Sequence, residues 1–142
     1  CYTYRIARSP VAIDRNIAWT FCRSLDTDIM ATEAQDLIGR YPATVWCSAR
    51  AKDTEAVVHV RRTALDVSDG RILFTISADR FVMHMVRSIV GTLVDVGRGR
   101  FGSGTVRRLI EGANRSAVGE TAPARGLCLE RVEYETDVTS SD

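Results

Sequence analysis

The chain has 142 residues, of which 45% are hydrophobic and 26% are charged. This length and apolar content suit one domain with its own core and argue against a chain that is disordered throughout. The formal net charge of +1 does not by itself indicate a nucleic-acid partner. The most apolar run, residues 81–96, is interrupted by His84, Arg87 and Asp95, and it is too short and too polar to span a membrane.

The spacing of the cysteines argues against a metal site. Cys1, Cys22, Cys47 and Cys128 are widely scattered and form no C-x-x-C pair, so neither a zinc site nor a thioredoxin-type motif is predicted. Reduced thiols in an intracellular, cytoplasmic protein are the simplest interpretation. No segment has the pattern of a signal peptide.

The first predicted elements are two extended segments. In residues 1–9 the side chains of Tyr2, Tyr4 and Ile6 alternate with polar ones, which is the period of a half-buried strand. Residues 15–22 form a second extended stretch that contains two aromatic residues.

A helix is predicted next, over residues 26–38. Asp26 or Thr27 can cap its first turn, and Gly39 is placed to end it in a left-handed conformation. The residues that fall on one face of this helix are Met30, Ala34, Leu37 and Ile38. Residues 40–51 are expected to be irregular or a short strand, broken at the proline.

The middle of the chain predicts a hairpin followed by a long helix. Residues 56–67 and 71–77 alternate as paired antiparallel strands, joined by a turn at 68–70. A helix is then predicted over 79–96. Its broad apolar stripe consists of Val82, Met85, Val86, Ile89, Leu93 and Val96.

The last third predicts a short helix over 105–111 that stops at Gly112, and a final strand over 127–134. Residues 137–142 are polar and are expected to be a disordered tail. The elements together predict one α+β domain over residues 1–136, with a mainly antiparallel sheet and helices packed on one face.

Gly97, Gly99 and Gly102 spell G-x-G-x-x-G, the letters of a dinucleotide-binding loop. Such a loop must follow a strand and open a helix. Here the glycines follow the end of the predicted long helix. A glycine-rich turn is therefore the better interpretation.

Four residues step along one side of the predicted long helix. Arg80, His84, Arg87 and Gly91 recur every three or four positions and so share a face. Glycine inside a helix costs about 1 kcal/mol relative to alanine and is tolerated where something must come close. The pattern alone favours the simpler interpretation, a solvated arginine face beside a small residue at a packing contact.

Residues 121–127 read TAPARGL and form a loop that leads into the last strand. Gly126 would let the backbone pass close to a ligand. The same residues also suit an ordinary strand start, and periodicity does not choose between the two.

These segments, in this order, resemble the tRNA pseudouridine synthase A family. Residues 81–93, FVMHMVRSIVGTL, are similar to its F-x-x-H-M-V-R-x-I-V-G-x-L helix. Residues 114–116 and 121–134 are similar to its D-R-x…T-A-P-x-x-G-L-x-L-x-x-V-x-Y ending, with Asn114 in place of the aspartate. Residues 2–6, YTYRI, are similar to its Y-x-Y-x-I strand.

Two departures from the family pattern stand out. The family carries its catalytic aspartate in an R-T-D-x-G loop upstream of the Y-x-Y strand, and this chain contains no such loop. Since the chain begins at Cys1, the resemblance implies an amino-terminal half that precedes it. In addition, residues 39–46 read GRYPATVW where the family has G-x-H-D-F-x-x-F. The changed stretch, at 41–45 above all, indicates a divergent member.

The resemblance implies an enzyme that isomerises uridine to pseudouridine in the anticodon arm of tRNA. It implies a homodimer and no cofactor or metal. Carried over by position, Tyr2 would lie against the flipped base, Arg87 would pair with the aspartate, and Leu127 would pack on the base. Arginines match phosphate geometry. The residues expected to contact RNA are His84, Arg80, Arg98, Arg100, Arg115 and Arg125.

The sequence leaves three hypotheses open. In the first, the chain is the carboxy-terminal half of a synthase and is inactive alone. In the second, it is a non-catalytic RNA-binding relative, which the divergent residues 41–45 favour. In the third, it is an unrelated α+β binding domain. Salt-sensitive binding to tRNA would separate the first two from the third.

Overall fold

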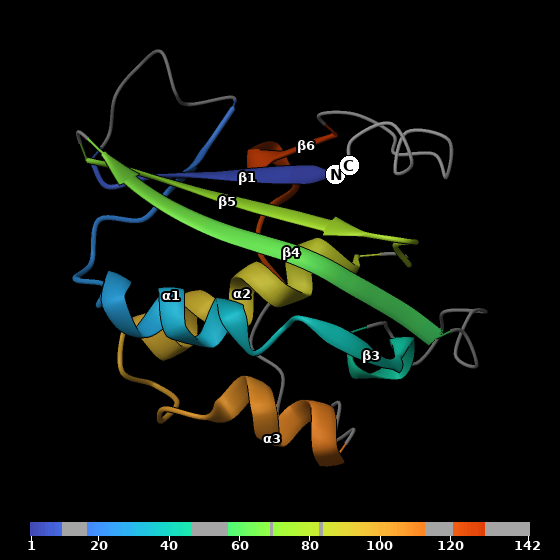
Figure 1. The fold of residues 1–142 in the computed structure, drawn as a ribbon. Helices are drawn as coiled ribbons and strands as arrows, with labels where there is room; N and C mark the ends of the chain where they lie inside the picture. The colour runs from blue at the N-terminus through green and yellow to red at the C-terminus, as the bar shows by residue number, and fades with distance from the viewer. Residues whose placement is uncertain (10–16, 47–56, 69, 83, 113–120, 130–142) are drawn as a thin grey trace.

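The computed structural model describes residues 1–9, 17–46, 57–68, 70–82, 84–112 and 121–129 (Figure 1). The strands are β1 (Tyr2–Ala7), β2 (Trp19–Thr20), β3 (Gly39–Pro42), β4 (Val57–Ser68), β5 (Arg71–Ala78) and β6 (Leu127–Leu129). The helices are α1 (Thr27–Gln35), α2 (Met85–Gly97) and α3 (Thr105–Gly112), and two 3-10 turns cover Ala43–Val45 and Ala124–Gly126.

The sheet has the strand order β2-β1-β5-β4-β3, with β6 also paired to β1. Its pairings are antiparallel except for the parallel contact between β1 and β2. One edge of β1 is shared: β6 pairs with its first part and β2 pairs with its last two residues. The predicted hairpin is confirmed, with Val67 opposite Ile72 and Leu65 opposite Phe74.

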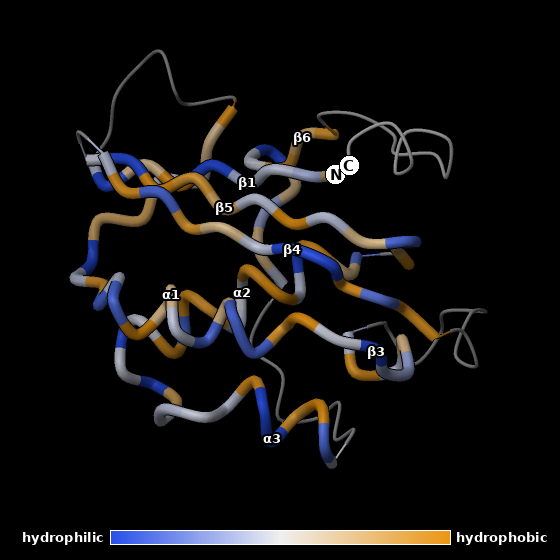
Figure 2. The backbone as a smooth tube through the Cα atoms, viewed as in Figure 1, coloured by the Kyte–Doolittle hydropathy of each residue, from blue (hydrophilic) through white to orange (hydrophobic). Residues whose placement is uncertain are grey.

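The helices cover one face of the sheet, which confirms the predicted α+β fold (Figure 1). α1 and α2 lie against the strands, and α3 lies beyond them, on the side away from the sheet. Every second residue of a strand faces the helices. Tyr4, Ile6, Ile72, Phe74 and Ile76 are therefore buried. Figure 2 shows that α2, which packs against this buried face of the sheet, is largely hydrophobic.

α1 begins where the sequence predicts and ends earlier. The side chain of Asp26 caps the helix by accepting a hydrogen bond from Ile29 N at 3.2 Å. The helix ends at Gln35 because the next three amides bond to carbonyls three residues back, which tightens the chain. Ile38 is consequently 44% exposed, so its predicted place on the buried face is wrong. Gly39, at φ 139°, opens β3 rather than ending the helix.

α2 begins at Met85, so the prediction that it starts at residue 79 is wrong. The side chain of Asp79 accepts from His59 N at 2.8 Å and its own amide donates to the His59 carbonyl oxygen, which holds this residue at the end of the hairpin. His84 then has φ 63° and ψ 9°, in the left-handed region. A helix cannot continue through that conformation, and α2 starts directly after it.

A buried carboxylate fixes α3. Glu33 of α1 is 1% exposed and accepts hydrogen bonds from Gly104 N at 2.9 Å and Val106 N at 3.1 Å. These amides lie at the beginning of α3, where backbone N–H groups have no partner within the helix. The loop between α2 and α3 is a turn, as predicted, with Gly99 at φ 87°. At Gly97, an added Cβ would come within 2.6 Å of the Met30 sulfur.

Candidate functional site

A pocket of about 320 Å³ opens between the start of β1, the start of α2 and the 121–127 loop. We refer to it as the β1–α2 pocket. It brings together Tyr2, Arg87 and Leu127, the three residues that the resemblance placed at the active site. The full lining consists of Tyr2, Phe81, Val82, His84, Met85, Val86, Arg87, Ala124 and Leu127.

Arg87 and Ala122 bind each other through two hydrogen bonds. The Nε of Arg87 donates to the Ala122 carbonyl oxygen at 2.7 Å, and the Ala122 amide donates to the Arg87 carbonyl oxygen at 3.0 Å. Arg87 is half-buried in the first turn of α2. The exchange therefore ties the loop to the helix and sets the direction of the guanidinium. It uses one N–H donor and leaves the terminal Nη groups as donors for an anion.

Tyr2 packs edge-on against Phe81. Their ring centroids lie 4.7 Å apart with an interplanar angle of 77°, which is a favourable aromatic geometry. Both side chains line the β1–α2 pocket and both are half-buried. The pocket thus has an aromatic wall on one side and the Arg87 side chain on another.

The helix face predicted for Arg80, His84 and Arg87 does not exist. Arg80 is exposed and precedes α2, so it shares no helical face with the other two. His84 also precedes the helix, at its N-cap position, and makes no side-chain capping hydrogen bond. His84 nevertheless lines the pocket, with an exposed side chain. Arg80 is not among the lining residues.

The later arginines divide into two places. Arg125 is exposed beside the pocket, in the 3-10 turn that contains Ala124. Arg98 and Arg100 follow the far end of α2, roughly 16–20 Å from Arg87 along the helix axis. There both form ion pairs with the buried carboxylate of Asp95, at 3.6 and 3.5 Å. Arg115, like residues 137–142, lies outside the described residues.

The sequence interpretation missed two contributors to this site. Phe81 was read as part of a helix, although it forms the aromatic wall with Tyr2. The alternation in residues 1–9 places Tyr4 only on one side of a half-buried strand, although its hydroxyl donates to the Pro123 carbonyl oxygen in the loop. Both residues stand inside the motifs that carry the resemblance, which was the available signal.

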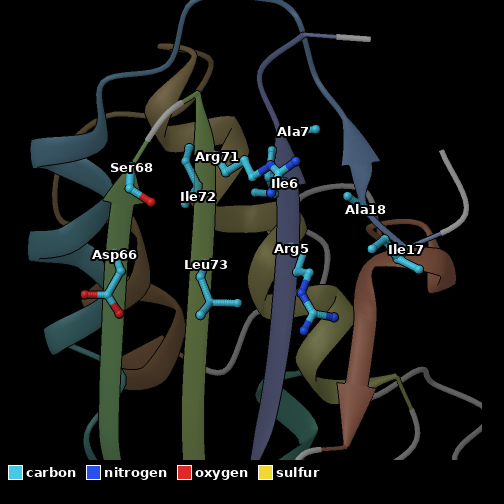
Figure 3. Close-up of a pocket in the computed structure, with 10 residues that line it drawn as sticks. All are labelled: Arg5, Ile6, Ala7, Ile17, Ala18, Asp66, Ser68, Arg71, Ile72 and Leu73. Atoms are coloured by element: carbon cyan, nitrogen blue, oxygen red, sulfur yellow. The ribbon is translucent and has the colours of Figure 1, made fainter. Parts of the chain in front are cut away.

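A second pocket, of about 270 Å³, lies on the face of the sheet away from the helices (Figure 3). Arg5, Leu73 and Asp66 stand opposite one another on neighbouring strands there, and Arg71 lies one row further on. This pocket shares no lining residue with the β1–α2 pocket. It is at the opposite end of β1, and it forms a separate surface.

The described residues contain neither a membrane-spanning helix nor a cluster of metal-binding side chains. Within them, no helix is both long and apolar enough to cross a membrane. No group of three or more histidine, cysteine, aspartate or glutamate side chains in that part of the chain is placed to hold a metal ion.

Comparisons with known proteins show which family the chain belongs to. A family model described as tRNA pseudouridine synthase matches residues 34–135, a span that includes α2 and Leu127. A relative from Hyphomonas neptunium named tRNA pseudouridine synthase A is 40% identical over 89% of this chain and 51% of its own length. Relatives of the same name from Moorella thermoacetica and Pelobacter propionicus are 37% and 38% identical over 94% of this chain, and over 54% and 55% of their own lengths.

The chain spans about half the length of the curated relatives that it matches. The family match covers more than half of the chain, and it includes the helix and loop that build the β1–α2 pocket. The chain therefore belongs to the tRNA pseudouridine synthase family.

Proposed function

We propose that this chain is the carboxy-terminal half of a tRNA pseudouridine synthase, and that an amino-terminal half supplies the catalytic aspartate. The intact enzyme would convert uridine to pseudouridine in the anticodon arm of tRNA, in the cytoplasm and as a homodimer. The observation that carries the proposal is the β1–α2 pocket, because it gathers Tyr2, Arg87 and Leu127 from the two ends and the middle of the chain.

The electrostatics of the pocket suit a carboxylate. Arg87 contributes a guanidinium whose Nε is already engaged, so its terminal groups can bind a carboxylate in a fixed orientation. The first turn of α2 also lines the pocket and favours negative charge, because backbone N–H groups at the start of a helix point outward. An aspartate brought here would be held ionised and ready to act as a nucleophile.

The proposed reaction needs no oxidant, reductant or co-substrate, because substrate and product are isomers. The aspartate attacks the nucleotide, the bond between the base nitrogen and the ribose breaks, and the base turns. C5 of the base then bonds to the ribose, and the bond between the aspartate and the nucleotide breaks, which returns the aspartate as a free carboxylate. The proton on C5 is lost while the released nitrogen gains one. Tyr2 would lie against the base and assist removal of that proton, while Leu127 would supply an apolar surface to the flipped nucleotide.

Contacts with tRNA are proposed for exposed arginine and histidine side chains. Arg125 and His84 stand at the pocket and would meet phosphates near the flipped uridine. Arg98 and Arg100 would meet a different stretch of the tRNA, because they lie at the other end of α2. Arg80 and Arg115 complete the proposed set.

The first experiment is to read the gene upstream of the Cys1 codon and to assay its full product. An in-frame R-T-D-x-G motif about one domain earlier, together with tritium release from C5-labelled uridine in tRNA, supports the proposal. The isolated chain of residues 1–142 should release none. A stop codon upstream, with tRNA binding but no release by the full product, would instead favour the non-catalytic RNA-binding relative.

A further inference from the structure

Tyr4 lies beside the β1–α2 pocket without lining it. The side chain is 0% exposed, and its hydroxyl donates to the carbonyl oxygen of Pro123. Tyr2, two positions earlier on the same strand, reaches the pocket itself. The two tyrosines of β1 therefore have different surroundings, and Tyr4 faces the loop that carries Leu127.

The loop is pressed against the Tyr4 ring. A Cβ added to Gly126 would lie 2.7 Å from the ring atoms Cε1 and Cζ of Tyr4 and 2.8 Å from the Arg5 carbonyl oxygen. Only a residue without a side chain allows this approach. Ala124 and Leu127, which both line the pocket, lie within two residues of that contact. The position of the Tyr4 ring consequently determines the distance between β1 and the loop residues Ala124 and Leu127.

The same loop holds Arg87. Pro123, which accepts from Tyr4, directly follows Ala122, which exchanges hydrogen bonds with Arg87. A continuous series of contacts thus runs from the Tyr4 hydroxyl through two neighbouring carbonyl groups to the guanidinium. Burial raises the pKa of Tyr4 well above its ordinary value, while the nearby charges of Arg87 and Arg125 lower it. The hydroxyl therefore keeps its proton and remains a donor at neutral pH.

We propose that Tyr4 is a positioning residue of the site: by holding the Pro123 carbonyl and the Gly126 backbone, it sets the places of Leu127 and Arg87. This role rests on the proposed synthase function. In this role Tyr4 touches neither substrate nor nucleophile, and it acts only through the 122–127 loop. Loss of its hydroxyl should therefore affect turnover more than tRNA binding.

The chain offers a matched control in Tyr41. This tyrosine is also buried, and its hydroxyl also donates to a backbone carbonyl oxygen, that of Leu37 at 2.7 Å. Its hydrogen bond joins β3 to the short segment that follows α1, and Tyr41 lines neither pocket. Tyr4→Phe and Tyr41→Phe thus remove the same group and a similar bond at two different places.

Both variants would be made in the full gene product and in the chain of residues 1–142. In the full product, Tyr4→Phe should lower kcat for tritium release roughly 10- to 100-fold, because small displacements of reacting groups have effects of that size. Its KM for tRNA should stay close to that of the wild type. Tyr41→Phe should change neither value beyond its effect on stability, which thermal unfolding of both variants would measure.

A second measurement follows the loop itself. In the chain of residues 1–142, Tyr4→Phe should speed hydrogen exchange of the Ala122 amide by roughly five-fold, the loss expected for one hydrogen bond. Tyr41→Phe should leave that amide unchanged. Both results together support the proposal.

Three outcomes would overturn it. Equal kcat for Tyr4→Phe and Tyr41→Phe, with an active wild type, leaves the synthase function standing and removes the role of Tyr4. Unchanged exchange at Ala122 in Tyr4→Phe does the same. Absence of tritium release by the wild type removes the proposed function and, with it, any role for Tyr4 in that reaction.

Discussion

Arg87 and Ala122 lie 35 positions apart in the chain and exchange two hydrogen bonds, one through the Arg87 side chain and one through its backbone. The side-chain bond is made by Nε, an atom that lysine lacks. Arg87→Lys should therefore lose the link to the loop as well as the forked geometry toward a carboxylate. In the full gene product we expect Arg87→Lys to be nearly as inactive as Arg87→Ala.

The affinity of both Arg87 variants for tRNA should stay near that of the wild type, since one half-buried arginine contributes little to phosphate binding. Tritium release and filter binding would measure the two properties separately. An Arg87→Lys enzyme with close to wild-type turnover would show that charge alone is enough at this position.

Gly126 should be intolerant of even a methyl group. Because a Cβ there would approach the Tyr4 ring and the Arg5 carbonyl oxygen below 3.0 Å, Gly126→Ala must displace the loop. We expect a loss of about 1–3 kcal/mol in unfolding free energy, as for other overpacked sites. Gly102→Ala is the control, because a Cβ at Gly102 meets nothing within 4 Å. Urea unfolding of both variants checks this, and equal stabilities would contradict the contact.

Glu33 should be among the most sensitive positions for stability. It is buried and accepts two backbone hydrogen bonds at the start of α3. Glu33→Ala leaves those amides without an acceptor, so we expect the unfolding free energy to fall by about 2–4 kcal/mol. The control is Glu111→Ala, at an exposed position of α3, which should change the unfolding free energy by less than about 0.5 kcal/mol. Chemical denaturation would measure the unfolding free energy of both variants. Equal values would show that the hydrogen bonds of Glu33 do not stabilise the fold.

Tyr41 should make stability depend on alkaline pH. Burial raises its pKa to about 12 from an ordinary value of 10.0. The folded state therefore holds this proton more tightly than the unfolded chain, so the stabilisation is complete below pH 10 and is lost as pH rises through 12. Between about pH 9 and pH 11, the wild type should lose roughly 1 kcal/mol more than Tyr41→Phe. Denaturation at several pH values would measure the unfolding free energy of both proteins. The prediction is wrong if this free energy changes with pH in the same way for the two.

Arg125 and Arg100 should differ in their effects on tRNA binding. Arg125 is exposed at the pocket, whereas Arg100 forms an ion pair with Asp95 and lies over the Phe101 ring. Arg125→Ala should reduce the slope of log affinity against log salt by about 1, the value for one phosphate contact. Arg100→Ala should have a smaller effect, because the wild-type arginine must leave its partner to reach RNA. Titrations at several salt concentrations would show the reverse order if the assignment is wrong.

The sequence predicted the elements whose period is set by burial on a single face. β1 and the hairpin of β4 and β5 were predicted within a residue or two, because their side chains alternate between the helix-covered face and the open face. A cap at Asp26 or Thr27 was predicted because a short polar side chain before a helix can accept a hydrogen bond from the first turn, and Asp26 is the residue that does so. These features depend on neighbours in the chain, so a linear pattern records them.

The start of α2 depended on contacts that leave no linear pattern. Phe81 and Val82 continue the apolar spacing of the helix, yet they belong to the pocket wall. The bonds between Asp79 and His59 and the left-handed conformation of His84 delay the helix by six residues. Hydrophobic periodicity indicates which side chains are buried, but it does not indicate the backbone conformation of the residues that carry them. The periodicity therefore predicts that the helix starts at residue 79 rather than at Met85.

The pocket was found through the resemblance rather than through the pattern. Tyr2, Arg87 and Leu127 have no common spacing, and only a family motif linked them. The contact between Gly126 and the Tyr4 ring also has no signature in the sequence pattern. The sequence indicates only that the backbone at Gly126 can pass close to a ligand. The partner of that approach is a side chain of the protein.

The pairing of β1 with β6 has a consequence for the order of assembly. Tyr2 and Leu129 stand opposite each other in the sheet although they come from the two ends of the described chain. During synthesis, the hairpin of β4 and β5 can form from neighbouring residues, but the first part of this edge of β1, at Tyr2 to Tyr4, must wait until β6 has left the ribosome. Contacts of such long separation are slow to close. The β1–α2 pocket includes Leu127 of β6, so it cannot be complete before β6 joins the sheet. An intermediate without β6 exposes the unpaired edge of β1 at Tyr2, Thr3 and Tyr4, which is the kind of edge that leads to aggregation.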